Sequence, residues 1–297
     1  MRTPKPTNDF TDVIVIYNPK STGPGKDMAR QLKRGISKYA VRLVETKHAG
    51  HAEELAYEFA KTTPRPLIIS ASGDGGYHEV VNGLIRAQSE GAQPTAGLLP
   101  AGNANDHYHN VHKTDLAEAI AAGQVQRIDI LKLTTTIGGE PFVRYAHSYI
   151  GFGLTPQVGS ELNKVELHWF NEIWIVLKAL FVLRPVRIIA GGKRRSYDSL
   201  IFSNVGKMSK VLSLSEHSAS NDGKFEVTLF KRRNKLQLIK LLIKASTGGL
   251  AGEEQNESYT FRTIKSALVQ ADGEVWTVDA DSEVVIGIEH NLLRCIV

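Results

Sequence analysis

The stretch PLIISASGDGGYHEVVNGL, residues 66–84, decides the fold of this chain. It opens with a short apolar run, places three glycines around Asp74, and closes with apolar residues at helical spacing. A buried strand, a tight glycine turn and a helix start in direct succession are typical of a phosphate-binding turn. The turn lacks the lysine of a P-loop and the Ser or Thr that follows it, so it is not a P-loop. The role of Asp74 within the turn therefore needs a different explanation.

Segments on both sides of this stretch repeat the alternation of strand and helix. We expect strands at 13–18, 41–46, 66–71 and 95–100, and helices at 25–39, 51–62 and 78–88. This alternation predicts a doubly wound α/β domain with a parallel sheet. Ligands of such sheets bind beyond the carboxyl ends of the strands, which is where three Gly- and Asn-rich loops fall, at 18–26, 72–76 and 99–106.

The sequence pattern changes near Arg127. From there, β-branched segments separated by Gly, Asn and Asp turns predict an all-β region. Two helix-like segments interrupt it, at 169–183 and 234–246. We therefore expect an α/β domain followed by a β-rich domain, with the active site between them.

Composition narrows the class of protein. The chain has 297 residues, 42% hydrophobic and 23% charged, with a net charge of +5, which is ordinary for a globular protein. The one cysteine, Cys295, excludes an intrachain disulfide and fits a reducing cytoplasm. The polar start has no apolar core of a signal peptide. The mild positive charge favours anionic membranes or nucleotides and does not by itself imply nucleic acid.

Two apolar segments allow either a core helix or a membrane contact. WFNEIWIVLKALFVL, residues 169–183, is interrupted by Glu172 and Lys178, so we expect no spanning helix. It fits a helix packed on the core or an apolar surface at a lipid entrance. FKRRNKLQLIKLLIK, residues 230–244, fits a membrane-surface helix or a core helix with a solvated basic face.

The loops carry groups suited to a nucleotide. Asp74 would repel phosphates unless a cation or water lies between them, which favours Mg²⁺ over the alternative of a plain Asp-Gly turn. Asn103 and Asn105 can hydrogen-bond a ribose, base or phosphate, while Asp106 adds a second carboxylate and Asp129 could be a third. The first loop offers Lys20, Ser21 and Lys26 for a triphosphate, and Thr46 ends a strand on the same edge.

Four motifs resemble those of the diacylglycerol kinase catalytic-domain family, which includes bacterial lipid kinases, sphingosine kinases and ceramide kinases. They are NPKSTGPGK, SGDGGYHEVVNGL, LPAGNAND and a late DGE at 272–274. The resemblance implies a Rossmann-like domain at 1–128 and a C-terminal β-sandwich at 129–283, with the last strand, about 284–297, returning to the first domain. It also implies that the nucleotide lies in the cleft between the domains.

The resemblance assigns a role to each matching residue. It implies Asp272 as general base, Glu274 as its partner and Asp74 in the metal and water network. Metal ligands are expected at Asp106, Asp129 and Asp222, the last away from the catalytic centre. The expected nucleotide-binding residues are Asn18, Lys20, Thr46, Ser72, Gly73, Asp74, Gly75, Gly76, Glu79, Gly102, Asn103 and Asn105.

The chain departs from the family pattern at several of these positions. Ser72 stands where the family has Gly, Gly76 where it has Thr, and His78 where it has Asn. This version of the motif is closer to that of the sphingosine kinases. Asn103 replaces another Thr, and His147 takes the place of an expected Asn. The lost hydroxyls could weaken the grip on phosphates.

The implied function is an ATP-dependent lipid kinase with Mg²⁺ that phosphorylates diacylglycerol or a related lipid. It would be cytoplasmic and peripherally bound to a membrane, could form a homodimer and would not bind nucleic acid. The alternatives are an NAD kinase-like enzyme and a nucleotide- or lipid-binding protein with reduced activity. Separately, His107, His109 and His112 lie close together without a Cys or carboxylate to complete a zinc site.

Overall fold

The structure, a computed structural model, describes residues 10, 12–21, 23–153, 156, 185–208, 212–213, 220–231 and 254–297. The chain divides into two compact units, one formed by Met1–Asp129 with Asn291–Val297 and the other by Ile130–His290. In this division the segment that returns to unit 1 is Asn291–Val297, compared with about 284–297 expected from the resemblance. The two apolar segments at 169–183 and 232–244 lie outside the described residues.

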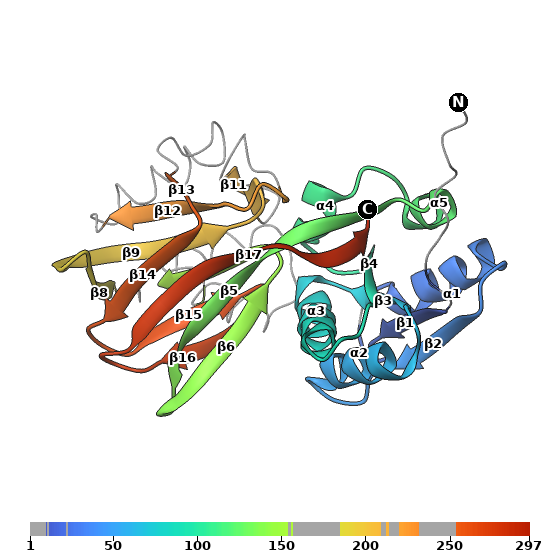
Figure 1. Ribbon diagram of the computed structural model, residues 1–297, viewed down its shortest axis with the longest axis horizontal. Coiled ribbons are helices and arrows are strands. Elements are labelled where there is room, and N and C mark those ends of the chain that lie inside the picture. Colours follow the sequence, from blue (N-terminus) through green and yellow to red (C-terminus); the bar gives the residue numbers. More distant parts are fainter. Residues whose placement is uncertain are drawn as a thin grey trace. The chain divides into compact units, whose positions relative to one another are not determined.

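Unit 1 alternates strands and helices along the chain (Figure 1). Its elements are β1 (Val13–Tyr17), α1 (Gly25–Gly35), β2 (Val41–Glu45), α2 (His51–Thr62), β3 (Leu67–Ser72), α3 (Asp74–Ser89), β4 (Thr95–Pro100), α4 (Asp106–Val111) and α5 (Leu116–Ala122). The strands pair in parallel in the order β4-β3-β1-β2. The end of β17 (Glu283–Ile296) joins the β4 edge, with Cys295 opposite Ala96.

The parallel strands of unit 1 are buried on both faces, which explains their continuous apolar runs. Alternate residues of β1, among them Val13 and Val15, pack in one cluster with Leu32 of α1 and Ile120 of α5. The helices α2 and α3 lie on the opposite face of the sheet (Figure 1). Gly83 of α3 is required where these two helices meet, because a Cβ atom there would collide with the carbonyl oxygen of Glu53.

The described part of unit 2 consists mainly of antiparallel strands. Its elements are most of β5 (Val125–Ile137), β6 (Glu140–Ala146), β7 (Tyr149–Gly153), β8 (Val186–Ala190), β9 (Lys193–Ser203), β10 (Lys207–Met208), β11 (Leu212–Ser213), β12 (Phe225–Lys231), β13 (Glu254–Asn256), β14 (Ser258–Thr263), β15 (Ala267–Ala271), β16 (Glu274–Val278) and most of β17. The main order is β16-β15-β7-β9-β8-β14-β17. The predicted combination of a parallel α/β region and an antiparallel β region is therefore confirmed.

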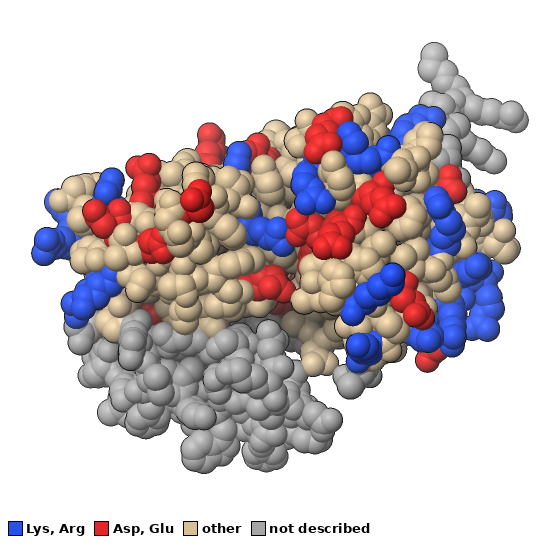
Figure 2. All heavy atoms as spheres, turned by 90° about the horizontal axis from the view of Figure 1, so that it is seen from below, with Lys and Arg blue, Asp and Glu red and all other residues tan. Residues whose placement is uncertain are grey.

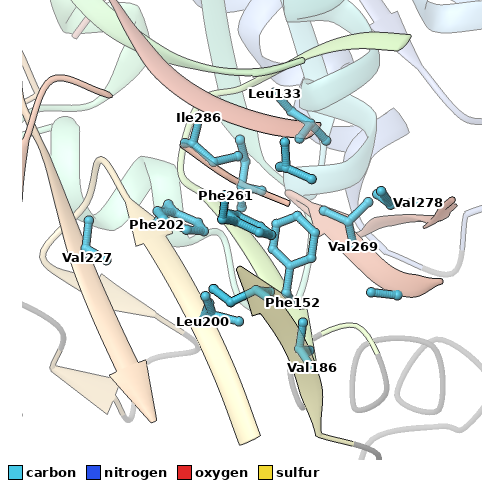
Figure 3. Packing of buried hydrophobic residues seen from close by; sticks show 14 of the residues in the cluster. Leu133, Phe152, Val186, Leu200, Phe202, Val227, Phe261, Val269, Val278 and Ile286 are labelled. Atoms are coloured by element: carbon cyan, nitrogen blue, oxygen red, sulfur yellow. The ribbon is translucent and has the colours of Figure 1, made fainter. Parts of the chain in front are cut away.

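Aromatic and aliphatic side chains together form the core of unit 2 (Figure 3). Phe152 of β7 meets Phe261 of β14 with ring centroids 5.3 Å apart, and its centroid lies 6.3 Å from that of Phe202 of β9. Both pairs have edge-to-face geometry, which suits the charge distribution of aromatic rings. These contacts join β7, β9 and β14 in the core of unit 2.

Candidate active site

Three loops at the carboxyl ends of β1, β3 and β4 come together in unit 1 through their glycines. A Cβ atom on Gly73 would lie 3.0 Å from the Cα of Gly102. One on Gly23 would lie 2.5 Å from the carbonyl oxygen of Ala101, and one on Gly25 would lie 2.5 Å from that of Ala71. Main chains can approach this closely only where the side chain is absent. The glycines therefore bring backbone groups of all three loops together at one edge of the sheet.

The helix α3 begins at Asp74, four residues before the predicted start, so Gly75 and Gly76 belong to its first turn. The first hydrogen bond of the helix joins the N–H of Tyr77 to the carbonyl oxygen of Gly73 at 3.1 Å. The main-chain N–H groups just before it have no acceptor within the helix. A helix of 16 residues also carries a partial positive charge at this end. These groups are suited to binding an anion.

Ser72 and Gly76 share one small space at the start of α3. A Cβ atom on Gly76 would lie 2.5 Å from the Ser72 Oγ. That hydroxyl donates to the carbonyl oxygen of Gly73 at 3.0 Å and lies 2.6 Å from the Oγ of Ser70. The Ser72 hydroxyl thus occupies the position that a side chain at residue 76 would need.

Asp74 connects the glycine turn to the second loop. Its Oδ2 accepts a hydrogen bond from the N–H of Asp106 at 3.2 Å, and its Oδ1 accepts one from the N–H of His107 at 3.3 Å. Asp106 is itself only 4% exposed. The two carboxylate-bearing residues are therefore neighbours, and they provide oxygen ligands of the type that Mg²⁺ prefers.

The side chain of Asn105 holds the second loop in shape. Its Oδ1 accepts from the N–H of Gly102 at 2.9 Å, and its Nδ2 donates to the carbonyl oxygens of Gly102 at 2.8 Å and Pro100 at 3.3 Å. Its backbone is left-handed, with φ of 50°. Asn103, by contrast, is exposed and able to meet a ligand. That Asn105 contacts nucleotide stays a prediction; in the structure its side chain bonds to the main chain of its own loop.

Asp129 is fully buried, and its Oδ1 accepts from the N–H of Asn291 at 2.6 Å. It was predicted as a metal ligand. In the structure its carboxylate anchors the segment that returns to unit 1 at the C-terminus.

The first loop presents lysines with different surroundings. The Oδ1 of Asn18 accepts from the N–H of Lys20 at 2.9 Å, which shapes the turn and leaves the Lys20 side chain exposed. Lys26 lies 3.5 Å from the carboxylate of Glu45. A hydrogen bond from the Tyr17 hydroxyl, at 2.6 Å, is the main cause that lowers the pKa of Glu45. Of the two lysines, Lys20 is the better placed to meet an anionic ligand.

Glu79, predicted to contact nucleotide, caps the helix α2. Its Oε1 accepts from the N–H of Gly50 at 3.0 Å and its Oε2 from that of Ala52 at 3.1 Å. These bonds satisfy N–H groups at the helix start, where negative charge is also favoured. The loop from β2 that carries Thr46 ends at the same Gly50, so Glu79 fixes the position of that loop.

We expect Glu79→Ala to lower the free energy of unfolding by about 1–2 kcal/mol, because two backbone N–H groups lose their acceptor. Glu79→Gln keeps one oxygen and should lose less. Urea unfolding of both variants measures this, with Glu118→Ala as a matched control on the exposed face of α5. Unchanged stability together with lost nucleotide binding would show that Glu79 acts on the ligand instead.

His107 and His109 of α4, with His112 just after it, do not converge as a group of metal ligands. His107 is fully buried against Tyr77, with ring centroids 5.2 Å apart, and His112 stacks on Tyr108 at 4.5 Å. Burial lowers the pKa of His112 to about 4, so the ring is neutral at physiological pH. Among the described residues, the ligand atoms that converge belong to His48, His51 and Glu54.

In unit 2, Asp272 and Gly273 form the two-residue turn between β15 and β16. Both residues have positive φ, 47° and 105°, as an Asp-Gly hairpin turn of type I′ requires. The Asp272 carboxylate is buried and accepts three main-chain hydrogen bonds. Its Oδ2 accepts from His147 at 2.7 Å, and its Oδ1 accepts from Ser148 at 3.0 Å and Tyr149 at 3.1 Å. Three such donors stabilise the ionised carboxylate.

His147 is the residue near Asp272 that the sequence reasoning treated only as a departure from the family. Its Nε2 lies 3.4 Å from the Asp272 Oδ2, and its Nδ1 lies 2.8 Å from the Ser148 Oγ. Both His147 and Asp272 have side chains with 0% exposure. A separation of 125 positions gives no local signal for this pair.

The remaining acidic candidates of unit 2 lie in more open surroundings. Glu274 is the first residue of β16, opposite Ala271, and is half-buried. Asp222 is exposed, and its Oδ1 accepts from the N–H of Lys224 at 3.0 Å in a turn before β12. Glu274 thus adjoins Asp272 in the same hairpin, whereas Asp222 belongs to a different turn.

Comparison with known proteins shows what this chain is similar to. The model of the diacylglycerol kinase catalytic domain matches residues 12–133. A diacylglycerol kinase of Bacillus subtilis is 28% identical over 290 residues, covering 91% of this chain and 88% of that protein. One of Staphylococcus saprophyticus is 24% identical, covering 79% and 77%. Among solved structures, a diacylglycerol kinase from Bacillus anthracis matches 98% of both chains with a TM-score of 0.71 and 19% identity, which supports the fold. These matches bear out the resemblance of this chain to the diacylglycerol kinase catalytic-domain family, and residues 12–133 are the part that the family model matches.

Proposed function

We propose that this protein transfers the γ-phosphate of ATP to the hydroxyl of diacylglycerol or a closely related lipid. The family match supports the broader class, a lipid kinase. The observation that carries the proposal is the joint packing of three glycine loops beside the start of α3, within the segment that the family model matches.

The nucleotide phosphates would lie at the start of α3. The N–H groups of Gly75 and Gly76 would donate to phosphate oxygens, and Lys20 would contribute positive charge. Thr46 is half-exposed at the end of β2 and would contact the nucleotide from the side. In phosphoryl transfer the protein acts mainly by positioning and by stabilising charge, which these groups are able to do.

A Mg²⁺ ion fits the pair Asp74 and Asp106. The main-chain N–H of Asp106 bonds to the carboxylate of Asp74, which places the two residues side by side, and their side chains offer only oxygen ligands. When bound there, the ion would neutralise phosphate charge. Asp74 itself would keep the glycine turn and the second loop in register, so that both contact the same phosphate group.

Asp272 would receive the proton of the lipid hydroxyl. As the oxygen–phosphorus bond to the lipid forms and the bond between the γ-phosphorus and the β-phosphate oxygen breaks, the hydroxyl proton passes to a carboxylate oxygen. A carboxylate is a weak base, so this transfer would come late in the reaction. The three N–H donors from residues 147–149 would hold Asp272 in one orientation throughout.

Peripheral membrane contact follows from the nature of the substrate and is part of the proposal, as is the possible homodimer. Within the described residues, no helix has the length and apolar character needed to cross a bilayer. Acidic and basic side chains are interspersed over the face seen in Figure 2, in keeping with the modest net charge of +5. We propose a lipid surface, and no nucleic acid, as the macromolecular partner.

An assay with radiolabelled ATP tests the substrate. Diacylglycerol, sphingosine and ceramide are offered in mixed micelles, and NAD in solution. We expect label in diacylglycerol, and none without Mg²⁺. Label in sphingosine would identify the acceptor suggested by Ser72 and Gly76, and label in NAD would support an NAD kinase-like enzyme. Nucleotide binding without transfer to any acceptor would support a binding protein.

A further inference from the structure

His48, His51 and Glu54 bring three metal-binding side chains together on unit 1. One ligand atom from each lies within 4.8 Å of the others. The His48 and His51 ring centroids are 4.7 Å apart, and the His48 Nε2 lies 4.0 Å from the Glu54 Oε2. The group lies in the loop after β2 and the first turn of α2, and the proposed kinase reaction does not use it.

The local backbone explains this convergence. His51 and Glu54 are three residues apart in α2, so their side chains lie on the same side of the helix. Gly50 has φ of 80°, which turns the chain sharply before the helix starts. The N–H of His51 donates to the carbonyl oxygen of His48 at 3.3 Å, which brings His48 back against the first turn.

Neighbouring backbone groups favour one neutral tautomer of each ring. The His48 Nδ1 lies 3.0 Å from the carbonyl oxygen of Ala49, which can only accept, so Nδ1 carries the proton in the neutral ring. The His48 Nε2 then has its lone pair free, on the side of Glu54. A backbone acceptor that orients a histidine in this way is the usual partner of a metal-binding imidazole.

His51 has the opposite arrangement. Its Nδ1 accepts from the N–H of Lys47 at 2.9 Å, so in the neutral ring the proton is on Nε2. A metal ion would take the Nδ1 lone pair in place of this hydrogen bond. Lys47 is exposed, so its N–H could turn to water at little cost.

We propose that His48, His51 and Glu54 bind a Zn²⁺ ion, with water completing a tetrahedral coordination. Two imidazole nitrogens and one carboxylate oxygen are a donor set that Zn²⁺ accepts well, whereas Mg²⁺ prefers oxygen ligands. Bonds of about 2.0–2.2 Å require the three groups to move closer together. The side chains of His48 and Glu54 are 57% and 63% exposed, which leaves them free to move and open to an ion from solvent.

A bound ion would fix the loop between β2 and α2. That loop carries Thr46, and its end at Gly50 is held by Glu79. Zinc would therefore join the loop to the first turn of α2 from the solvent side. Because only the folded chain brings the three groups together, binding should raise stability in proportion to the logarithm of zinc concentration.

Isothermal titration of the full, metal-free and tag-free chain with Zn²⁺ tests the proposal. We expect one ion per chain, with affinity at least about tenfold lower in His48→Ala and in Glu54→Gln, the loss of 1.4 kcal/mol or more that corresponds to one ligand. His109→Ala removes an exposed histidine from α4 and should bind zinc as the wild type does. Titration with Mg²⁺ should give no binding that depends on His48.

A second readout separates coordination from nonspecific binding. Co²⁺ in place of Zn²⁺ should give the visible absorption of tetrahedral coordination, and this absorption should disappear in His51→Ala. Circular dichroism shows whether each variant is folded, and the conservative Glu54→Gln remains informative if an alanine variant is not. Equal zinc affinity in the wild type and Glu54→Gln, with no tetrahedral cobalt spectrum, would overturn the proposal. Neither measurement depends on turnover, so failure here would leave the kinase proposal untouched.

Discussion

Asp272→Asn is expected to lower kcat by about 10²–10⁴-fold, the contribution of a positioned general base. The KM for ATP should stay unchanged, because the nucleotide groups we propose belong to unit 1. An asparagine can offer its oxygen to Ser148 and Tyr149, but its amide would then face the N–H of His147. Two donors would face each other, and we also expect a loss of about 1–3 kcal/mol in stability.

The stability loss makes a control necessary. Asp279→Asn is well matched, because the Asp279 carboxylate also accepts two main-chain hydrogen bonds in unit 2, from Gly138 at 3.1 Å and Gly139 at 2.8 Å. It should lower the melting temperature and leave kcat unchanged at temperatures where the protein is folded. If Asp272→Asn were folded and its kcat stayed within about threefold of the wild-type value, the loss would be far smaller than a general base is expected to contribute. Asp272 would then not be the base.

Asp74→Asn is expected to produce the second large effect, a loss of at least about 10²-fold in kcat/KM, as expected when stabilisation of transition-state charge is removed. The variant should also need more Mg²⁺ to reach half-maximal rate. Asparagine retains an oxygen for one of the two N–H groups of Asp106 and His107. Its amide would face the other N–H, so we expect some loss of stability as well, and the rates should be compared at temperatures where the variant is folded.

The matched control for this variant is Asp115→Asn in the same unit. Asp115 precedes α5, and its Oδ1 accepts from the N–H of Ala117 at 2.8 Å. Asparagine caps helices about as well as aspartate, so neither stability nor rate should change. Steady-state kinetics over a range of Mg²⁺ concentrations distinguishes the two variants. An unchanged Mg²⁺ requirement in Asp74→Asn would exclude Asp74 from metal binding.

Unit 1 could be predicted well because its signals are local. The helix predicted at 51–62 and the strand predicted at 95–100 match α2 and β4 residue for residue. In a parallel sheet, short apolar runs bounded by Gly and Pro indicate clearly where each strand begins and ends. The start of α3 was predicted four residues too late, because consecutive glycines are typical of a loop. At a helix start, however, the first N–H groups need no partner within the helix, and glycine is tolerated there.

Unit 2 shows where local patterns stop being sufficient. The apolar and β-branched residues of 141–153 would suit one continuous strand, but the structure divides them into β6 and β7 at His147 and Ser148. The N–H groups of these two residues bond to the carboxylate of Asp272 instead of continuing a strand ladder. No pattern within 141–153 contains that information, because the partner lies 125 positions away.

The crowding between Ser72 and Gly76 makes these two positions an epistatic pair. The family pattern has Gly and Thr where this chain has Ser and Gly, so a hydroxyl is present in both versions but at opposite ends of the turn. Gly76→Thr alone would push a Cβ atom into the Ser72 Oγ, 2.5 Å away. Ser72→Gly alone would leave the turn with no hydroxyl at either position. The residues at positions 72 and 76 therefore depend on each other. Only the double substitution of Ser72 by Gly and Gly76 by Thr would give the family's turn without a steric collision or a missing hydroxyl.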